Sequence, residues 1–379
     1  MHMFDIIVVG GNLSGLSAAI SAANKNLKVA LIERHEKPFL PAHCGEAISH
    51  VTADFLKIEK RKCPKNEIRE IIINISKLKK YTLNLSENKI YIIDRNYLEN
   101  NLLKEAKEKK TNIFLGRRMI KFNPPNEIIM DNNEKIYGKI LIDASGISCI
   151  IGKQLGINTK LKPKDIGVCI QSRIYSKFNP KKMYMWWGEP YAPFGYAWLF
   201  PINENYANIG LGIIGGQNLI LEDLLKKYIK TMINEKYKII HTFRSCEPMA
   251  KPLENIVINN IMFVGDSARL VDPASGAGIH NAVFSGTLAG LISSKYINGE
   301  IKSLDLYQKL MTQKIKKINK TYKNKSKLTT TKQYNKAFNR LFTSINIINK
   351  VIPNFYQNQI TKLLYKDINK VEQLRHKNY

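Results

Sequence analysis

The sequence predicts an α/β protein in which a parallel-sheet domain is interrupted by an inserted antiparallel sheet and followed by a helical C-terminal region. Three observations predict this architecture. A strand–turn–helix–strand pattern fills the first 33 residues, short alternating strands fill the middle, and a buried-strand pattern returns near residue 261 before a helical tail. The 379 residues are 44% hydrophobic and 24% charged, values typical of a globular protein with two or three domains.

The first half of the chain carries the parallel-sheet pattern. Residues 4–9 (FDIIVV) predict a buried strand, 14–24 a helix rich in small residues, and 28–33 (KVALIE) a second strand. This order is a βαβ unit, which requires a parallel sheet. Residues 96–110 predict a charged surface helix, and 139–143 (KILID) predict another buried strand.

The middle of the chain changes character. Between about 165 and 255, short alternating runs are separated by Pro, Gly and Asn, which favours an antiparallel sheet. A buried strand at 261–265 and a small-residue helix at 278–296 follow. The predicted units are therefore a discontinuous first domain, an inserted β-rich domain and a basic helical region, at 1–165 with 256–300, 166–255 and 301–379. Residues 65–92 are consistent with either the first domain or the β-rich domain.

A glycine-rich turn follows the first strand. In GGNLSG, Gly10 and Gly15 fill the outer positions of a dinucleotide fingerprint, and Asn12 stands at the middle position, where glycine is usual. Asn tolerates left-handed backbone better than other non-glycine residues, so we expect that conformation at Asn12. Glu33, at the end of the second strand, is placed to accept the ribose hydroxyls. The pattern predicts a dinucleotide site, and a turn without ligand is the alternative.

A second glycine block lies about 250 residues later, in VGDSARLVDPASGAGIHNAV (264–283). Asp266 follows a strand and is suited to accept hydrogen bonds from ribityl hydroxyls. Gly278 and Ile279 open a helix whose N-terminus stabilises negative charge on a flavin ring. Paired with the first turn, this block predicts a flavin site. FAD is expected rather than FMN because Glu33 requires an adenosine-bearing cofactor.

Together these motifs resemble the geranylgeranyl reductase family, within the group of flavoproteins built like p-hydroxybenzoate hydroxylase. The resemblance covers about residues 3–300. It rests on the two glycine blocks, on PAHCGEAI (41–48), on IDRNYLENNL (93–102), and most specifically on GYAWLFP (195–201), which matches the family's Tyr-x-Trp-x-Phe-Pro motif. This sequence departs from the family's patterns at Asn12, at Ser145, where hydroxylases carry an Asp, and at Ile202, where Lys is frequent.

The resemblance implies a Rossmann-like FAD-binding domain and an enzyme that reduces isoprenoid carbon–carbon double bonds, often in archaeal ether-lipid precursors. It also implies further residues around FAD. Added to Gly10, Asn12, Gly15, Glu33, Asp266, Gly278 and Ile279, these are Ser14, Cys44, Gly45, Ala47, Arg95 and Met119. Cys44 is also the candidate catalytic thiol, which would tune the flavin or position substrate. The alternative for Cys44 is a small buried hydrophobe.

The GYAWLFP segment has a physical interpretation of its own. Tyr196, Trp198 and Phe200 alternate along a strand and therefore share one face. Such a wall suits a polyprenyl chain, because burial of each CH₂ is favourable by about 0.8 kcal/mol. Ordinary core packing is the alternative, because aromatic residues favour strands in any case.

The net charge of +28 predicts an anionic partner or reflects compositional drift. Residues 301–335 contain ten Lys and one acid, and an apolar stripe follows in 337–352. This pattern suggests a helix lying on anionic lipid. A helix that caps the β-rich domain is the alternative. Two apolar stretches, 6–24 and 273–294, are too rich in turn residues to span a bilayer. With no signal peptide predicted, we expect a cytoplasmic protein held peripherally at the inner face of the cell membrane.

Other readings of the sequence are a flavin monooxygenase or halogenase of the same fold, and a basic nucleic-acid-binding flavoprotein. No interleaved aromatic and basic motif supports the latter, so no nucleic-acid partner is expected. Five scattered cysteines without a CxxC pair argue against a metal site and fit a reducing compartment. No second GxGxxG indicates a nicotinamide site, so ferredoxin, reduced deazaflavin and NAD(P)H all stay open as electron donors. The basic net charge would also suit an acidic electron-transfer protein as a partner.

Overall fold

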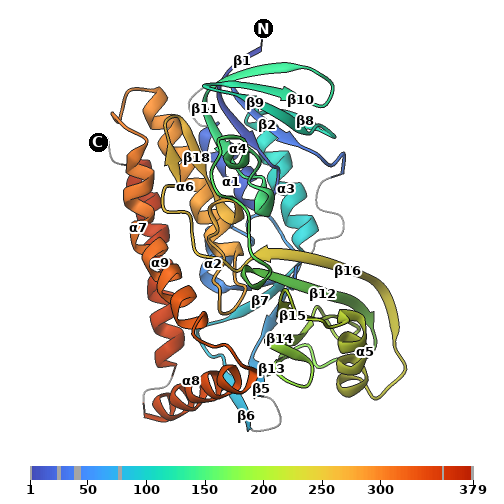
Figure 1. Cartoon of the computed structure of the whole chain (residues 1–379). Coiled ribbons are helices and arrows are strands. Elements are labelled where there is room, and N and C mark those ends of the chain that lie inside the picture. Colours follow the sequence, from blue (N-terminus) through green and yellow to red (C-terminus); the bar gives the residue numbers. More distant parts are fainter. Residues whose placement is uncertain (1, 24–26, 38–43, 76–78, 352–353, 377–379) are drawn as a thin grey trace.

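The structure is a computed structural model, and it describes residues 2–23, 27–37, 44–75, 79–351 and 354–376. Figure 1 shows a mixed sheet with its helices at the N-terminal end of the molecule, a second sheet beside it, and C-terminal helices along one side. This arrangement confirms the predicted fold class. The last residue of the predicted first helix, residue 24, lies outside the described residues.

The first sheet has eight strands and a parallel centre. Five parallel strands lie in the order β18, β11, β1, β2, β8, and β17, β9 and β10 add antiparallel pairs. The bounds of the parallel strands are β1 His2–Val9, β2 Val29–Glu33, β8 Asn112–Leu115, β11 Lys135–Asp143 and β18 Ile261–Phe263; those of the others are β9 Met119–Asn123, β10 Glu127–Met130 and β17 Val257–Ile258. The carboxyl ends of β1, β2, β11 and β18 meet at one edge, the place where open α/β sheets bind ligands.

Helices α1 (Leu13–Ala22) and α6 (Ile279–Ile297) pack against each other next to this sheet, and α3 (Arg95–Glu108) packs beside α1. The two helices contain most of the two apolar stretches that imitate membrane spans. Their contact is close, because a Cβ added to Gly286 would lie 2.1 Å from the Ser14 carbonyl oxygen, and one added to Gly290 would lie 2.2 Å from that of Ala18. The apolar small-residue pattern therefore reflects helix packing. Among the described residues, no helix is long and apolar enough to cross a membrane.

The second sheet has seven strands in the order β16, β12, β15, β14, β13, β5, β6, and it is antiparallel except where β13 pairs with β5. The antiparallel character predicted for the middle of the chain is confirmed. Helix α5 (Leu221–Met232) packs on one face through its buried apolar side chains. The strand bounds are β5 Glu70–Ile75, β6 Lys79–Asn84, β12 Ile166–Tyr175, β13 Lys182–Gly188, β14 Ala192–Pro201, β15 Tyr206–Ile214 and β16 Lys238–Pro248.

Smaller elements connect the two sheets. Strands β3 (Ala47–Ser49), β7 (Ile90–Ile93) and β4 (Lys65–Ile68) form a three-stranded sheet, and α2 (His50–Phe55) follows β3 directly. Helix α4 (Ile150–Gln154) follows β11.

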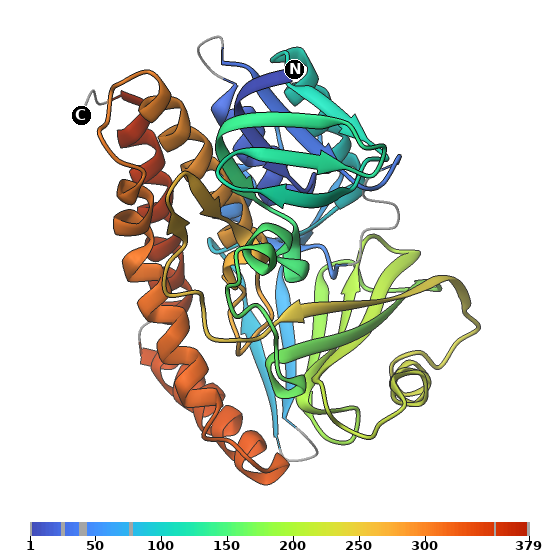
Figure 2. The same cartoon turned by 45° about the horizontal axis from the view of Figure 1, so that its top comes forward.

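The C-terminal region consists of α7 (Asp305–Lys325), α8 (Thr331–Val351) and α9 (Phe355–His376). Figure 2 shows these helices extending along one side of the molecule, beside both sheets. Lys314 of α7 forms an ion pair with Asp367 of α9, and Asp367 also faces His280 of α6 at 3.2 Å.

Helix α8 packs on strands β14, β13, β5 and β6 of the second sheet, as one of the two alternatives for residues 337–352 predicts. The Phe338 ring stacks on Trp187 of β13 at a centroid distance of 4.2 Å, and Phe342 packs in the same cluster. Other apolar side chains of the stripe and its surroundings stay exposed, among them Leu341 and Ile347. Residue 352 lies outside the described residues.

Candidate active site

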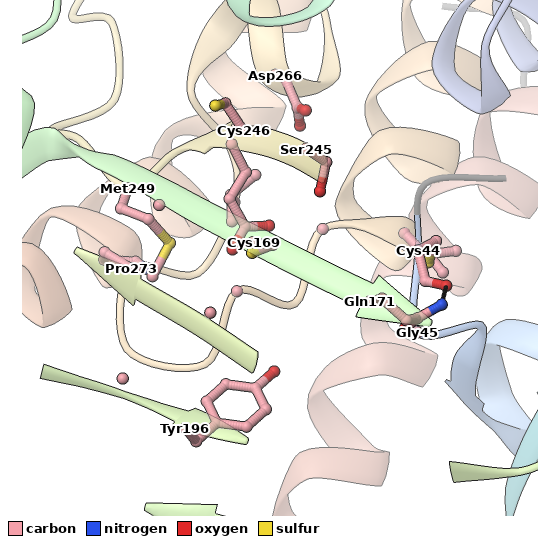
Figure 3. A pocket seen from close by; sticks show the side chains of 18 of the residues that line it. Cys44, Gly45, Cys169, Gln171, Tyr196, Ser245, Cys246, Met249, Asp266 and Pro273 are labelled. Carbon is pink, nitrogen blue, oxygen red and sulfur yellow. Dashed lines mark hydrogen bonds between the residues drawn. The ribbon is translucent and has the colours of Figure 1, made fainter. Parts of the chain in front are cut away.

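A cavity lies where the carboxyl edge of the first sheet meets strands β12, β14, β15 and β16 of the second. Figure 3 shows Asp266, Cys44 and Tyr196 arranged around it. The structure brings most of the predicted residues together there: Asn12, Ser14, Cys44, Gly45, Arg95, Asp266, Gly278, Ile279, Tyr196, Trp198 and Phe200. Five predicted residues do not line this cavity, namely Gly10, Gly15, Glu33, Ala47 and Met119. Met119 is buried in the main hydrophobic core at the start of β9.

The glycine-rich turn has the backbone geometry that a dinucleotide site requires. Gly10 has a φ of +107°, a conformation that side chains disfavour, and a Cβ there would lie 2.2 Å from the Ala144 carbonyl oxygen. Glu33 is buried and accepts a hydrogen bond from the Gly11 N–H at 2.7 Å through Oε2. Its Oε1 accepts from the His35 N–H at 2.9 Å. The carboxylate is therefore held rigidly beside the turn.

Asn12 departs from the expected conformation. Its φ of −78° and ψ of −173° place it in extended backbone, so the prediction of a left-handed residue is wrong. The side chain instead caps α1, because Oδ1 accepts from Ser14 N at 3.1 Å and Gly15 N at 3.4 Å. The amide Nδ2 donates to the Ala144 carbonyl at 2.9 Å. Asn is a favoured N-cap residue, and this preference determines the backbone here.

The second glycine block presents an open helix end and a carboxylate to the cavity. No described side chain caps α6, which begins after Gly278. The Asp266 carboxylate receives no hydrogen bond from the described residues, and burial raises its pKa while Arg95 opposes the shift. Ribityl hydroxyls could donate to this half-buried carboxylate, and an electron-rich ring could lie at the free helix N-terminus of the same cavity. The residues present therefore fit a flavin.

Cys44 is connected to the aromatic strand through a residue that sequence reasoning missed. Gln171 of β12 is buried, and its Nε2 donates to the Cys44 carbonyl at 3.0 Å (Figure 3). Its Oε1 accepts from Trp198 Nε1 at 2.8 Å. Burial raises the pKa of the Cys44 thiol, although Arg95 opposes this shift, so the thiol is protonated at neutral pH. Residues 41–43 of the same block lie outside the described residues.

Glu46, quoted in the block but given no role, holds the loop in place. It has a φ of +66° and is buried. Its carboxylate accepts from Asn208 Nδ2 at 2.7 Å and from the Arg95 backbone N–H at 3.3 Å, and it pairs with Arg173. Burial raises the pKa of Glu46, and Arg173 is the largest opposing influence. Glu46 thus joins the cavity loop, α3 and the second sheet.

The aromatic residues of β14 form one wall of the cavity. The centroid of Trp198 lies 5.6 Å from that of Tyr196 and 6.1 Å from that of Phe200. Trp198 pairs across the strands with Gly210, whose added Cβ would lie 2.5 Å from the indole, so glycine is what allows the ring to lie flat. All three residues line the cavity, and Trp198 and Phe200 also belong to a buried cluster, so the wall serves both the cavity and the core.

Comparisons with known proteins agree with this geometry. Residues 165–246 match the geranylgeranyl reductase catalytic domain, and residues 5–159 match the FAD dependent oxidoreductase family. A digeranylgeranylglycerophospholipid reductase of Methanothrix thermoacetophila is 29% identical over 83% of this chain and 84% of its own length. Another, from Methanococcoides burtonii, is 30% identical over 81% of this chain and 78% of its own.

Solved structures place the chain in the same group. A geranylgeranyl bacteriochlorophyll reductase-like protein of Thermoplasma acidophilum has a TM-score of 0.80 and 26% identity, and the match covers 89% of this chain and 90% of that protein. The myxobacterial chondrochloren halogenase, 17% identical with a TM-score of 0.70 over 97% of each chain, shares the fold alone. Because a 30% identical relative extends over most of both chains, this chain belongs to the geranylgeranyl reductase family of FAD-dependent oxidoreductases.

Proposed function

We propose that the protein saturates carbon–carbon double bonds in the geranylgeranyl chains of a glycerophospholipid, with FAD as its cofactor, in archaeal membrane-lipid synthesis. The printed names of its relatives support this substrate class. The observation that carries the proposal is one cavity with the dinucleotide-turn residues Asn12 and Ser14 on one side and the aromatic wall of β14 on another. A cofactor and an apolar chain would meet there.

The predicted residues divide into two groups around FAD. The adenosine and pyrophosphate part would lie on the turn after β1, and the flavin part near Asp266 and the start of α6. Bound reduced FAD supplies a hydride for the reaction. The residues assigned to the cofactor are Gly10, Asn12, Ser14, Gly15, Glu33, Cys44, Gly45, Ala47, Arg95, Met119, Asp266, Gly278 and Ile279.

Tyr196, Trp198 and Phe200 would hold the prenyl chain. Each buried CH₂ contributes about 0.8 kcal/mol, so the aromatic wall would favour binding of the chain. Gln171 acts as a positioning residue in this scheme, because its amide fixes the Trp198 indole and the Cys44 backbone at the same time. A protonated thiol at Cys44 would pack against the substrate or the ring and take no part as a nucleophile.

The test is anaerobic incubation of the dithionite-reduced protein with a geranylgeranylated glycerophospholipid, followed by mass spectrometry for added hydrogen pairs. The purified protein should be yellow and release FAD. Trp198→Ala should lower turnover. Trp186→Ala is the matched control, because Trp186 lies on the neighbouring strand, outside the cavity, and packs with the α5 cluster. Release of FMN, or a lipid without added hydrogen, would contradict the proposal.

We further propose that the lipid is met at an anionic membrane surface. Exposed apolar side chains lie on α8 and α9, with 57% exposure at Ile347 and 56% at Ile360, on a chain of net charge +28. Basic residues near such a surface contribute about 1 kcal/mol each, within a Debye length. Salt should therefore remove the electrostatic part of binding, and the apolar part should survive.

Vesicle co-sedimentation separates the two contributions. Deleting the C-terminal region is unsuitable because Phe338 and Asp367 are packed into the fold. The variant Ile347→Ser/Ile360→Ser should lose the binding to anionic vesicles that survives high salt. Ile220→Ser is the control, because Ile220 is 64% exposed just before α5, which lies on the opposite side of the molecule from α8 and α9 (Figure 1). Intact protein that ignores anionic vesicles at low salt would refute membrane association and leave the FAD assignment intact.

A further inference from the structure

The cavity is lined by a half-buried acid that the motifs do not explain. Glu247 lies near the end of β16 and lines the cavity. Its carboxylate forms no hydrogen bond and no ion pair with any residue in the described part of the chain. Close packing holds it in place, since a Cβ on Gly276 would lie 2.6 Å from Oε1 and one on Gly167 would lie 2.9 Å from Cγ. Both neighbours are glycines, which leave room for this side chain.

The strand register places Glu247 on the same sheet face as the aromatic wall. Ser245 pairs with Cys169, Cys169 pairs with Gly212, and Gly212 pairs with Tyr196, so this row crosses four strands from β16 to β14. Glu247 is two residues beyond Ser245 and therefore points to the same side. Its carboxylate and the aromatic residues thus converge on one cavity.

The charged surroundings of Glu247 come from several elements. Lys325, at the end of α7, lines the cavity, and its Nζ is buried without a hydrogen-bond partner among the described residues. Asp266 faces the same space from the turn before α6. The titratable groups that interact with Glu247 are Asp266, Lys325, Cys169, Cys246 and Tyr196.

This environment keeps a proton on the acid at neutral pH. Burial is the main cause that raises the pKa of Glu247, Asp266 adds to the rise, and Lys325 opposes it, with a result of about 8. Burial likewise lowers the pKa of Lys325 to about 8. A general acid works best when its pKa lies near the operating pH, and Glu247 meets that condition.

We propose that Glu247 donates the proton in alkene reduction, an inference that rests on the proposed function. Saturating one double bond requires two new C–H bonds. One uses the hydride of reduced FAD, and the other uses the proton of the Glu247 carboxyl, whose O–H bond breaks. The resulting carboxylate is stabilised by the Lys325 ammonium and regains a proton from water.

The protonation of Glu247 can be measured without turnover. Infrared spectra of the oxidised, FAD-loaded protein should contain a protonated-carboxyl stretch that shifts in D₂O, titrates near pH 8 and disappears in Glu247→Gln. Glu204→Gln is the control, because Glu204 is an exposed acid at the turn before β15. A band that persists unchanged in Glu247→Gln would overturn the assignment.

Single-turnover oxidation then tests the role. The pre-reduced protein is mixed anaerobically with the prenyl lipid or with ferricyanide, which accepts electrons without a proton. Glu247→Gln should retain FAD and normal ferricyanide oxidation, but oxidation by lipid should slow by about 10²–10⁴-fold, the usual contribution of a positioned acid. Glu247→Asp should recover part of the rate, and it keeps the test decisive if the Gln variant does not fold.

The pH profile supplies a readout that a merely structural role would not move. Lipid-driven oxidation should decline above about pH 8 in the wild type as Glu247 loses its proton. Lys325→Met should move that decline to higher pH, because the ammonium that lowers the Glu247 pKa is gone. If the wild type oxidises with lipid and Glu247→Gln is equally fast, the proton-donor role is wrong. If ferricyanide alone oxidises the wild type, the proposed function itself fails.

Discussion

The close approach of α1 and α6 predicts that one added methyl group will disturb both stability and FAD binding. In Gly286→Ala the new Cβ would lie 2.1 Å from the Ser14 carbonyl oxygen, whereas real Cβ atoms keep at least 3.0 Å, so the helices must separate by 0.9 Å (3.0 − 2.1). The obstacle is a backbone atom, so no side-chain rotation relieves it. Ser14 lines the cavity, and α1 therefore carries the disturbance to the site.

The size of the effect follows from two opposing contributions. Overpacking costs about 3 kcal/mol at the upper end of its usual range, and replacing Gly by Ala inside a helix returns about 1 kcal/mol. The net loss is about 2 kcal/mol, or about 4 °C in melting temperature at ~2 °C per kcal/mol for larger chains. FAD affinity should fall about tenfold, which corresponds to about 1.4 kcal/mol.

Thermal melts by circular dichroism and FAD titrations by flavin fluorescence would measure both quantities. Gly290→Ala is the matched variant, with its Cβ 2.2 Å from the Ala18 carbonyl oxygen, one turn farther from the cavity. It should lose similar stability and keep more of its FAD affinity. If Gly286→Ala melts and binds FAD like the wild type, the helix contact does not position the dinucleotide turn, and the reasoning is refuted.

Two further predictions concern the cap of α1 and the C-terminal helices. Asn12→Gly should keep or tighten FAD binding because it frees first-turn N–H groups of α1. Asn12→Val should cost about 1 kcal/mol of stability through loss of the cap and should weaken FAD binding. Equal FAD affinities of all three proteins in fluorescence titrations would contradict this. Asp367→Asn should cost about 3 kcal/mol in urea unfolding, because it leaves the half-buried Lys314 without its counterion. Glu372→Gln, at a pair with Arg375 on the surface of α9, should stay within about 0.5 kcal/mol. Burial opposes ionisation of Asp367, but the hydrogen bond from His280 and the charge of Lys314 outweigh it and lower its pKa, so its stabilising contribution should be present above about pH 4 and lost as pH falls through the lower folded-state pKa.

Local sequence pattern was sufficient to predict the parallel strands and the glycine turns. A buried strand, a turn glycine and a helix rich in small residues are all defined within about 30 residues, and Gly10 and Gly278 occupy the predicted places. Asn12 shows where the local pattern misleads. The fingerprint suggests left-handed backbone at this position, whereas the asparagine side chain caps the helix from extended backbone.

The side of the cavity formed by the second sheet was harder to predict because its residues come together through strand register. Gln171, Glu46 and Glu247 are polar residues in segments that otherwise predict ordinary strands and loops. Each becomes significant only when β12, β14 and β16 are aligned, and no short-range signal specifies that alignment. The available clue in the sequence was a polar residue at an inward-facing position of an alternating strand, as at Gln171.

This difference in how the two sides are specified has a chemical consequence. The groups assigned to FAD come mainly from one sheet and its helices, whereas the aromatic wall and Glu247 belong to the other. On the proposed function, we expect substitutions in β14 or β16 to change the prenyl chain accepted, or the pKa of Glu247, without altering the dinucleotide turn. Glu46 is the exception, because it ties the cavity loop to Arg173 and Asn208 of the second sheet.

We therefore expect Glu46→Gln to weaken both FAD binding and lipid turnover, whereas Glu247→Gln should affect lipid turnover alone. Parallel FAD titrations and single-turnover measurements on the two variants would distinguish them, and a Glu46→Gln protein with normal FAD affinity would show that the two sides are positioned independently.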